Sequence, residues 1–243
     1  MESHKTQGAL RSVVVPAHNE SENLVVLIPL LTGALRAAGG RFELIIVNNA
    51  SNDTTAQKVP EFQRTIPELR MVDEPVLGYG RAVLAGLRSA RGDSIGIMRA
   101  DNQEKPEDLC RMFADLTERN LSFYKAVRKH RMGDGLLRVV TSFFYNMLFR
   151  ILFRLRSRDL NATPKVFTRE FMDAAHLVST DWFIDAEMVI KAEHMGYRVG
   201  ETEIEYLPRL KGKSTVRVRH VFEFLRNMIS WFFRIRNGKL LEQ

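Results

Sequence analysis

Two polar side chains follow an apolar run in the middle of the chain, and their types suit a hard cation. The run Ser94–Met98 leads into Arg99, and Asp101 and Gln103 come directly after it. Side chains two positions apart at a strand end point the same way, so Asp101 and Gln103 can face one cavity. A carboxylate and an amide can hold Mg²⁺ or Mn²⁺ when a diphosphate supplies further oxygens. Asp101 and Gln103 are therefore our candidate metal ligands.

Two further polar clusters follow apolar runs nearer the amino terminus. The run Val13–Val15 stops at Pro16 and leads into His18-Asn19-Glu20, and the run over 43–47 leads into Asn48-Asn49. Apolar, β-branched runs of this kind are typical of buried parallel strands. Ligands of such sheets bind beyond the carboxyl ends of the strands. The three clusters therefore predict one site at one edge of a sheet.

The elements that must position these clusters alternate along the first half of the chain. We expect strands at 12–15, 43–47, 69–72 and 94–98, and helices at 21–38, 53–64, 80–90 and from Pro106 onward. Glycines end the first helix, and a proline followed by two acids begins the last one. This alternation predicts an α/β fold with an open, mostly parallel sheet and flanking helices.

Length and composition set the class of protein. The chain has 243 residues, of which 45% are hydrophobic, which suits one large domain or a domain with an appendage. A single cysteine, Cys110, excludes a disulfide framework. The net charge of +7 indicates a polyanionic partner, which could be nucleic acid, anionic lipid or a phosphate-bearing substrate. We find neither a signal peptide nor an apolar stretch of about 18 residues, so no membrane span is expected.

The polar clusters belong to longer motifs that occur in an informative order. Val13–Leu24 contains Pro-x-x-Asn-Glu-x-x-x-Leu after a strand, and Ile46–Thr55 is close to Val-Asp-Asp-Gly-Ser-x-Asp-x-Thr. Leu77–Asp93 combines a glycine-rich helix start with an Ala-Arg-Gly-Asp turn. Together these segments resemble family 2 glycosyltransferases, which implies the Rossmann-like GT-A fold. The resemblance runs from about Ser12 to Ser214.

Later segments resemble one branch of that family, the dolichyl-phosphate mannose synthase-like polyprenyl-phosphate glycosyltransferases. Asp181–Glu187 is similar to the Phe-x-Asp-x-Glu helix start of the branch, and Arg209–Ser214 matches Arg-x-x-Gly-x-Ser. The resemblance implies an inverting hexosyltransferase that moves a sugar from a nucleotide diphosphate sugar to undecaprenyl or dolichyl phosphate. It also implies a peripheral position at the cytoplasmic side of a membrane, and it leaves a homo-oligomer open.

The resemblance implies roles for individual residues. The acceptor is already an anionic phosphate, so the reaction needs no strong base but needs groups that hold two anionic reactants together. Asp185 and Glu187 either position a substrate or complement a helix dipole. The residues implied in catalysis and phosphate binding are Asp101, Arg128, Arg138, Ser142, Arg209, Lys213 and Ser214. The residues implied in binding the nucleotide sugar are Pro16, Ala17, His18, Glu20, Asn48, Gly78, Gly80 and Asp101.

Two positions depart from the family pattern. The family's Asp-Ala-Asp-x-Gln is here Arg99-Ala100-Asp101-Asn102-Gln103, and the acidic pair that reads the base is Asn48-Asn49. An amide can still hydrogen-bond a base edge. Arg99 leaves three alternatives: it pairs with a diphosphate, it points away from a metal at Asp101 and Gln103, or it marks a weakened enzyme. We favour a metal, Mg²⁺ or Mn²⁺, still held by Asp101.

Two amphipathic, basic stretches complete the chain. Residues 136–155 carry an apolar stripe flanked by Arg138, Arg150, Arg154 and Arg156, and residues 221–235 carry a second stripe. Such helices either cover their own sheet or lie at a membrane surface, and we favour the membrane. We expect a glycosyltransferase domain over 1–215, with an amphipathic insertion at about 134–158, and an interfacial helix over 216–243.

Two other classes of function compete with the enzyme. A catalytically weak binding subunit that recruits lipid or a partner enzyme is motivated by Arg99. A nucleic-acid binder is suggested by charge alone. We disfavour it because the basic residues alternate with an apolar stripe rather than with exposed stacking aromatics.

Overall fold

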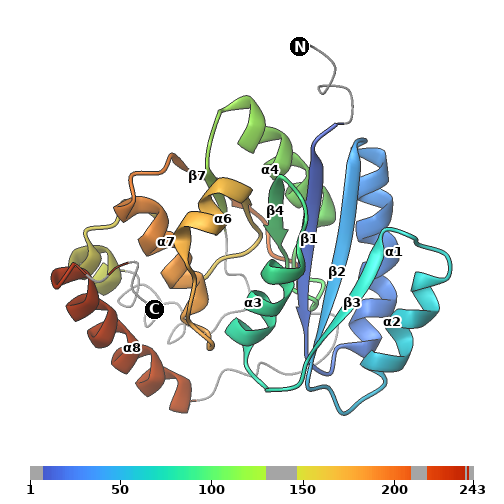
Figure 1. The fold of residues 1–243 in the computed structure, drawn as a ribbon, viewed down its shortest axis with the longest axis horizontal. Helices are drawn as coiled ribbons and strands as arrows, with labels where there is room; N and C mark the ends of the chain where they lie inside the picture. The colour runs from blue at the N-terminus through green and yellow to red at the C-terminus, as the bar shows by residue number, and fades with distance from the viewer. Residues whose placement is uncertain (1–7, 130–146, 209–217, 239, 241–243) are drawn as a thin grey trace.

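The fold is a central sheet covered by helices on both faces (Figure 1). The structure, a computed structural model, describes residues 8–129, 147–208, 218–238 and 240. The strands are β1 (Leu10–Ala17), β2 (Arg41–Asn49), β3 (Leu69–Glu74), β4 (Ser94–Ile97), β5 (Phe123–Arg128), β6 (Lys165–Thr168) and β7 (Val199–Ile204). They form one seven-stranded sheet in the order β3-β2-β1-β4-β6-β5-β7. The predicted mostly parallel α/β sheet is confirmed, with β6 antiparallel to both of its neighbours.

Helices pack on each face of this sheet. Their bounds are α1 (Ser21–Ala37), α2 (Thr55–Gln63), α3 (Tyr79–Ser89), α4 (Pro106–Glu118), α6 (Arg169–Ala175), α7 (Ile184–His194) and α8 (Val218–Arg236). A further short helix covers 147–153. One core cluster joins the sheet to α1 and α4, and a second joins it to α3, α6 and α7. The carboxyl ends of β1, β2 and β4 thus emerge between two helical layers.

The central strand, β1, shows why a run of apolar residues predicts a buried parallel strand. Val13, Val14 and Val15 are all fully buried, with Val14 in one core cluster and its two neighbours in the other. A parallel strand covered on both faces needs apolar residues at every position. Both strand neighbours of β1 pair with it in parallel register. The polar residues that follow Val15 therefore reach the edge of the sheet.

The last helix is part of the core. Met228 and Trp231 of α8 are each 5% exposed, and the Trp231 ring stacks on Phe183 at 5.8 Å. The Lys191 ammonium group of α7 lies 5.2 Å from the centre of the Trp231 ring. Figure 1 shows α8 beside α7, at the opposite side of the molecule from β3. Met228 and Trp231, which belong to the apolar stripe predicted over 221–235, therefore pack in the core rather than against a membrane.

Candidate functional site

The loops after β1 and β2 are tied together at the carboxyl edge of the sheet. His18 Nδ1 lies 2.7 Å from the carbonyl oxygen of Asn49. The Asn19 side-chain oxygen accepts a hydrogen bond from the Asn52 amide at 2.8 Å. Asn19 has a φ of 56°, a left-handed conformation that asparagine tolerates better than most residues. The first two predicted clusters therefore form one rim.

Asn48 and Asn49 have different surroundings. The side-chain nitrogen Nδ2 of Asn48 donates to Asp73 Oδ1 at 2.8 Å. The buried side-chain oxygen Oδ1 of Asn48 has no hydrogen-bond partner among the described residues. Asn49 Oδ1 accepts from the Gly78 amide at 2.9 Å, and its Nδ2 donates to the Val76 carbonyl at 2.8 Å. Asn48 is thus suited to contact a ligand, and Asn49 holds the segment before α3. No spacing or motif in the sequence indicates a role for Asp73.

Two glycines at the start of α3 permit close backbone packing. A Cβ atom on Gly80 would lie 2.6 Å from the Asp181 carbonyl oxygen, and one on Gly78 would lie 2.8 Å from the Thr180 carbonyl oxygen. Between them, Tyr79 stacks on Trp182 with ring centres 4.5 Å apart. This packing accounts for both glycines without a ligand. It also brings the start of α3 against the segment that leads into α7.

Asp101 and Gln103, the candidate metal ligands, lie in the loop between β4 and α4. The backbone amide of Gln103 donates to Asp101 Oδ1 at 3.3 Å, and Asp101 is 4% exposed. Gln103 Nε2 donates to the Leu207 carbonyl at 3.2 Å, which leaves its Oε1 as the available metal donor. No three His, Cys, Asp or Glu residues gather into a metal site within the described part of the chain. One carboxylate and one amide fit a cation that diphosphate oxygens also coordinate.

Arg99 is held at the centre of this edge. Its terminal nitrogen Nη2 donates to the Asn161 carbonyl at 3.0 Å, and its backbone amide donates to Glu104 Oε2 at 3.1 Å. Arg99 Nε is buried and has no acceptor among the described residues. Electrostatic interactions connect the guanidinium group with Tyr79, Glu104, Asp185 and Tyr206. Arg99 therefore belongs to the site.

Glu104 is a buried acid that sequence reasoning missed. Its Oε1 accepts hydrogen bonds from the Thr163 hydroxyl and, at 3.2 Å, from the Tyr206 hydroxyl. Burial raises the pKa of Glu104 to about 7, although Arg99 opposes the shift. Thr163 and Tyr206 come from segments far along the chain. No spacing or motif in the sequence signalled this cluster.

The two acids at the start of α7, Asp185 and Glu187, form hydrogen bonds and ion pairs with other residues of the protein. Asp185 Oδ1 accepts from Lys165 Nζ at 2.5 Å, and both side chains are at most 2% exposed. Glu187 accepts from the Val178 and Ser179 amides at 2.9 and 2.7 Å, and pairs with Lys191. Glu187 thus orders the segment before α7, whereas the Lys165–Asp185 pair lies beside Arg99.

The predicted phosphate-binding residues are only partly described. Arg128 forms a two-point ion pair with Asp159, with contacts of 2.7 and 2.5 Å, and its guanidinium lies 5.6 Å from the centre of the Tyr206 ring. An added phosphate would have to share Arg128 with Asp159. The other predicted residues of this group lie outside the described residues: Arg138, Ser142, Arg209, Lys213 and Ser214.

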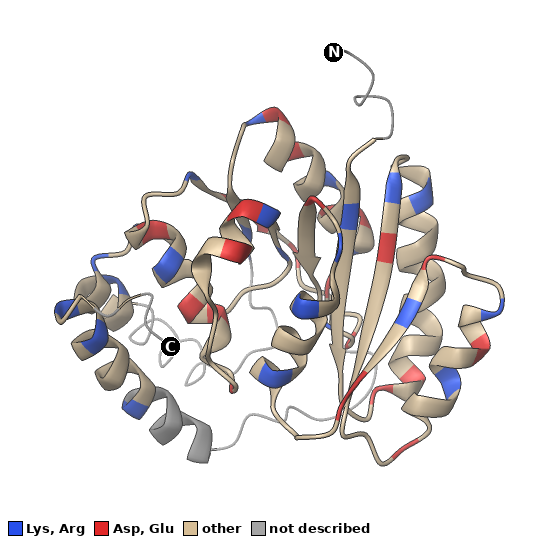
Figure 2. Ribbon diagram, in the orientation of Figure 1, with Lys and Arg blue, Asp and Glu red and all other residues tan. Residues whose placement is uncertain are grey.

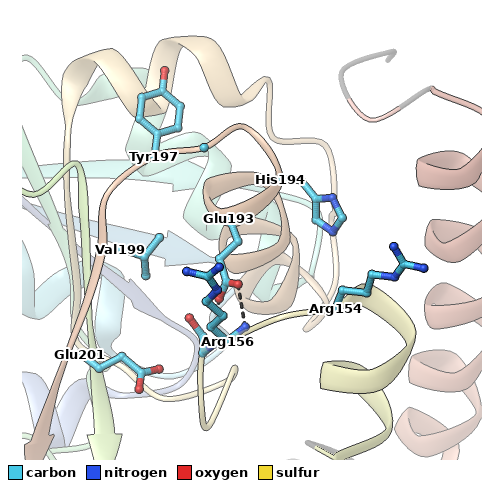
Figure 3. A pocket seen from close by; sticks show the side chains of 9 residues that line it. Arg154, Arg156, Glu193, His194, Tyr197, Val199 and Glu201 are labelled. Atoms are coloured by element: carbon cyan, nitrogen blue, oxygen red, sulfur yellow. Dashed lines mark hydrogen bonds between the residues drawn. The ribbon is translucent and has the colours of Figure 1, made fainter.

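A separate cavity of about 590 Å³ opens where α7 ends and β7 begins (Figure 3). Glu193, in its wall, accepts from the backbone amides of Arg156 and Ser157 at 2.7 and 2.8 Å. Glu201 accepts from the Arg158 amide at 2.6 Å. These acids fix the segment that follows the helix over 147–153. The cavity lies at the amino end of β7, away from the strand ends that carry the site.

Solved structures share this architecture. Glucosyl-3-phosphoglycerate synthase of Mycobacterium tuberculosis, crystallised with Mn²⁺, uridine diphosphate and phosphoglyceric acid, matches with a TM-score of 0.70. The match covers 95% of this chain and 79% of that one at 17% identity. The fold is therefore of the GT-A type, as the resemblance of the motifs predicts.

Residues 12–177 match Glycosyl transferase family 2, and the chain belongs to this family. It is similar to dodecaprenyl-phosphate galacturonate synthase of Rhizobium johnstonii, with 27% identity over 93% of this chain and 67% of that protein. It is also similar to undecaprenyl-phosphate 4-deoxy-4-formamido-L-arabinose transferase of Pectobacterium atrosepticum, with 32% identity over 67% of this chain. The chain spans 50% of the length of this second relative.

Proposed function

We propose that the protein transfers a sugar, a hexosyl group, from a nucleotide diphosphate sugar to a polyprenyl phosphate with inversion. The observation that carries this proposal is a set of unsatisfied polar atoms at the carboxyl edge of the sheet. Of five buried side-chain atoms without a partner among the described residues, four lie there: Asn48 Oδ1, Tyr79 Oη, Arg99 Nε and Asn161 Oδ1. Buried polar atoms are normally paired, so such a cluster favours a polar ligand.

The donor is expected to lie across this edge. Asn48 Oδ1, with Asp73 beside it, can accept hydrogen bonds from a base, and His18 lies at the same rim. Asp101 and Gln103 would hold Mg²⁺ or Mn²⁺ together with the diphosphate. When bound, such a cation neutralises charge on the departing diphosphate. Pro16, Ala17 and Glu20 are proposed to shape the nucleotide-sugar pocket. Gly78 and Gly80 would act on it through the close packing of the start of α3 against residues 179–181.

The transfer exchanges one bond at the anomeric carbon for another. An oxygen of the lipid phosphate forms the new bond to carbon as the bond to the nucleotide diphosphate breaks. The attacking phosphate is anionic near neutral pH, so no strong base is needed. The engagement of Asp185 by Lys165 agrees with this scheme. Arg128 and the predicted residues Arg138, Ser142, Arg209, Lys213 and Ser214 are proposed to hold the phosphates.

An exposed apolar surface supports access to a lipid acceptor. Ile151 on the helix over 147–153 is 67% exposed, and Ile229 and Phe233 on α8 are 56% and 54% exposed. Arginines lie near these residues in the sequence, and over residues 226–236 of α8 Figure 2 shows basic and no acidic bands. Apolar side chains beside arginines suit an anionic headgroup layer. Within the described residues, no helix meets the length and hydropathy needed to cross a bilayer. We propose peripheral binding at the cytoplasmic face.

The direct test is transfer itself. The protein is incubated with undecaprenyl phosphate, Mn²⁺ or Mg²⁺ and a panel of uridine and guanosine diphosphate sugars, and glycolipid is measured by mass spectrometry. One donor should give product, and Asp101→Ala should abolish it. Asp173→Ala, on α6, is the matched control and should retain activity. A lack of glycolipid with every donor would contradict the proposed function.

The alternative is a catalytically weak GT-A subunit that recruits lipid or a partner enzyme. The guanidinium of Arg99 at a position where the family pattern has a carboxylate favours it. Calorimetry separates the two functions. A nucleotide sugar that binds without any turnover on polyprenyl phosphate supports the subunit, and turnover supports the enzyme.

A further inference from the structure

Arg99 offers charged hydrogen-bond donors where the family pattern has a carboxylate. We propose that its guanidinium group binds an anionic oxygen of the donor substrate, either on the diphosphate or on the carboxylate of a hexuronic acid sugar. This inference rests on the proposed function, since it assumes that a nucleotide sugar occupies the site. It adds a residue that selects among donors.

The guanidinium group is fixed in place but not saturated. Nη2 donates to the Asn161 carbonyl at 3.0 Å, which holds the side chain across the edge of the sheet. Nε is buried and lacks an acceptor among the described residues. A guanidinium has five N–H donors and no acceptor. The group that completes its bonding must therefore be a hydrogen-bond acceptor.

Two other unsatisfied groups belong to the same cluster. The Tyr79 hydroxyl and Asn161 Oδ1 are buried without partners among the described residues, and Tyr79 interacts electrostatically with Arg99. The stack on Trp182 holds the Tyr79 ring. Arg99 Nε and the Tyr79 hydroxyl can each donate to a ligand oxygen, and Asn161 Oδ1 can accept from a ligand hydroxyl. An anionic oxygen close to a hydroxyl is found in sugar acids and in sugar diphosphates.

The acids near Arg99 are engaged by other groups. Asp185 is paired with Lys165 at 2.5 Å. Glu104 accepts hydrogen bonds from the hydroxyls of Thr163 and Tyr206, and from the backbone amide of Arg99 rather than from its guanidinium. Neither acid has a hydrogen bond to the guanidinium in the structure. The guanidinium is therefore available for a ligand, and planar guanidinium groups favour carboxylate and phosphate.

The test measures binding by calorimetry to the full-length chain, without an acceptor. The probes are UDP, UDP-glucose and UDP-glucuronic acid, or their guanosine counterparts if GDP binds more tightly than UDP. Arg99→Gln should weaken UDP about tenfold or more if the guanidinium contacts the diphosphate. If it contacts the sugar, the variant should instead lose an about tenfold preference for the glucuronic acid probe over UDP-glucose, with UDP unchanged.

Controls keep the outcomes distinct. Arg111→Gln, on the exposed side of α4, should bind all three probes like the wild type. If Arg99→Gln does not fold, Arg99→Lys decides, because lysine keeps the charge but loses the planar donor fork. A folded variant that binds every probe within about twofold of wild type, which is under 0.5 kcal/mol, overturns the inference and leaves the proposed function standing. If the wild type binds neither uridine nor guanosine diphosphate compounds, the proposed function itself fails.

Discussion

Lys125 is a cation buried inside the sheet, beside the strands that lead to the site. Its ammonium group is fully buried, donates to the Ala126 and Arg158 carbonyls, and lies 3.4 Å from Glu201. Burial lowers the pKa of Lys125 from 10.5 to about 8, although Glu201 opposes the shift. The folded state thus releases this proton at a lower pH than the unfolded state does.

The sign of the pH dependence follows from that shift. Between about pH 8 and pH 10.5 the unfolded chain binds more protons at Lys125, so stability rises with pH across this window. Across the full window, the free energy of unfolding should rise by about 3 kcal/mol. Lys125→Met should flatten this rise in urea denaturation measured at about pH 7.5 and about pH 9.5. Equal pH slopes in variant and wild type would show that Lys125 titrates normally.

Asn48 is the second residue whose identity can be tested on stability. Its amide donates to Asp73 Oδ1 at 2.8 Å, so Asn48→Asp would place two carboxylates in contact. Asp73 is exposed, which limits the repulsion to about 1 kcal/mol at pH 7. Denaturation at about pH 4 should recover most of this loss, because one carboxylate then binds a proton. The double variant Asn48→Asp with Asp73→Asn should be about as stable as the wild type at both pH values, because it again pairs one carboxylate with one amide. An equal loss at both pH values would instead indicate a packing defect.

At the scale of elements, the sequence predicts strands and helices that have a clear apolar pattern of their own. It does not indicate elements whose charged residues are buried against partners from distant segments. β1, β2 and β4 are short continuous apolar runs rich in β-branched residues, a pattern typical of buried parallel strands. The sequence does not indicate β6, because the strand has four residues and begins with Lys165, whose charge pairs with Asp185 from another element. α7 buries Asp185, Glu187 and Lys191 together, so its pattern carries little amphipathic signal. The candidate site divides in the same way: spacing predicts Asp101 and Gln103 as metal ligands, which stays a prediction, whereas Glu104 and Asn161 come beside Arg99 only through the fold.

The start of α3 provides an element-scale prediction. Gly80→Ala would place a methyl group 2.6 Å from the Asp181 carbonyl oxygen, so α3 and the segment before α7 must move apart. We expect a loss of about 2 kcal/mol in urea denaturation. Gly33→Ala is the matched control, because a Cβ there meets nothing within 4 Å on the exposed side of α1. That substitution should stabilise the protein by about 0.5–1 kcal/mol. A neutral Gly80→Ala would show that the two segments do not pack closely.

At the scale of the whole molecule, core contacts connect the site with the helices that carry the exposed apolar residues Ile151, Ile229 and Phe233. Trp231 and Met228 anchor α8 in the same core cluster as α7, and Asp185 in the first turn of α7 interacts electrostatically with Arg99. Glu193 and Glu201 bind the backbone that follows the helix over 147–153. A membrane bound at this surface would therefore be held at a set distance from the strand ends.

The exposed residues of α8 give the whole-molecule prediction. Ile229→Glu with Phe233→Glu removes two exposed apolar side chains and adds repulsion from anionic lipid, while Met228 and Trp231 keep the helix in place. Each buried side chain of this size contributes about 1.5 kcal/mol or more, so sedimentation with phosphatidylglycerol vesicles should show binding weakened about 100-fold. Transfer to a short, water-soluble prenyl phosphate should be unchanged, because the site is intact.

A matched pair separates this surface from general hydrophobicity. Val25 and Leu30 on α1 are 43% and 56% exposed, so Val25→Glu with Leu30→Glu makes the same chemical change on another face. This variant should bind the vesicles like the wild type. Wild-type binding should also fall as salt rises, because the arginines around Ile229 and Phe233 attract the anionic headgroups. If the α1 variant loses binding as the α8 variant does, α8 is not the docking surface and the proposed membrane orientation is wrong.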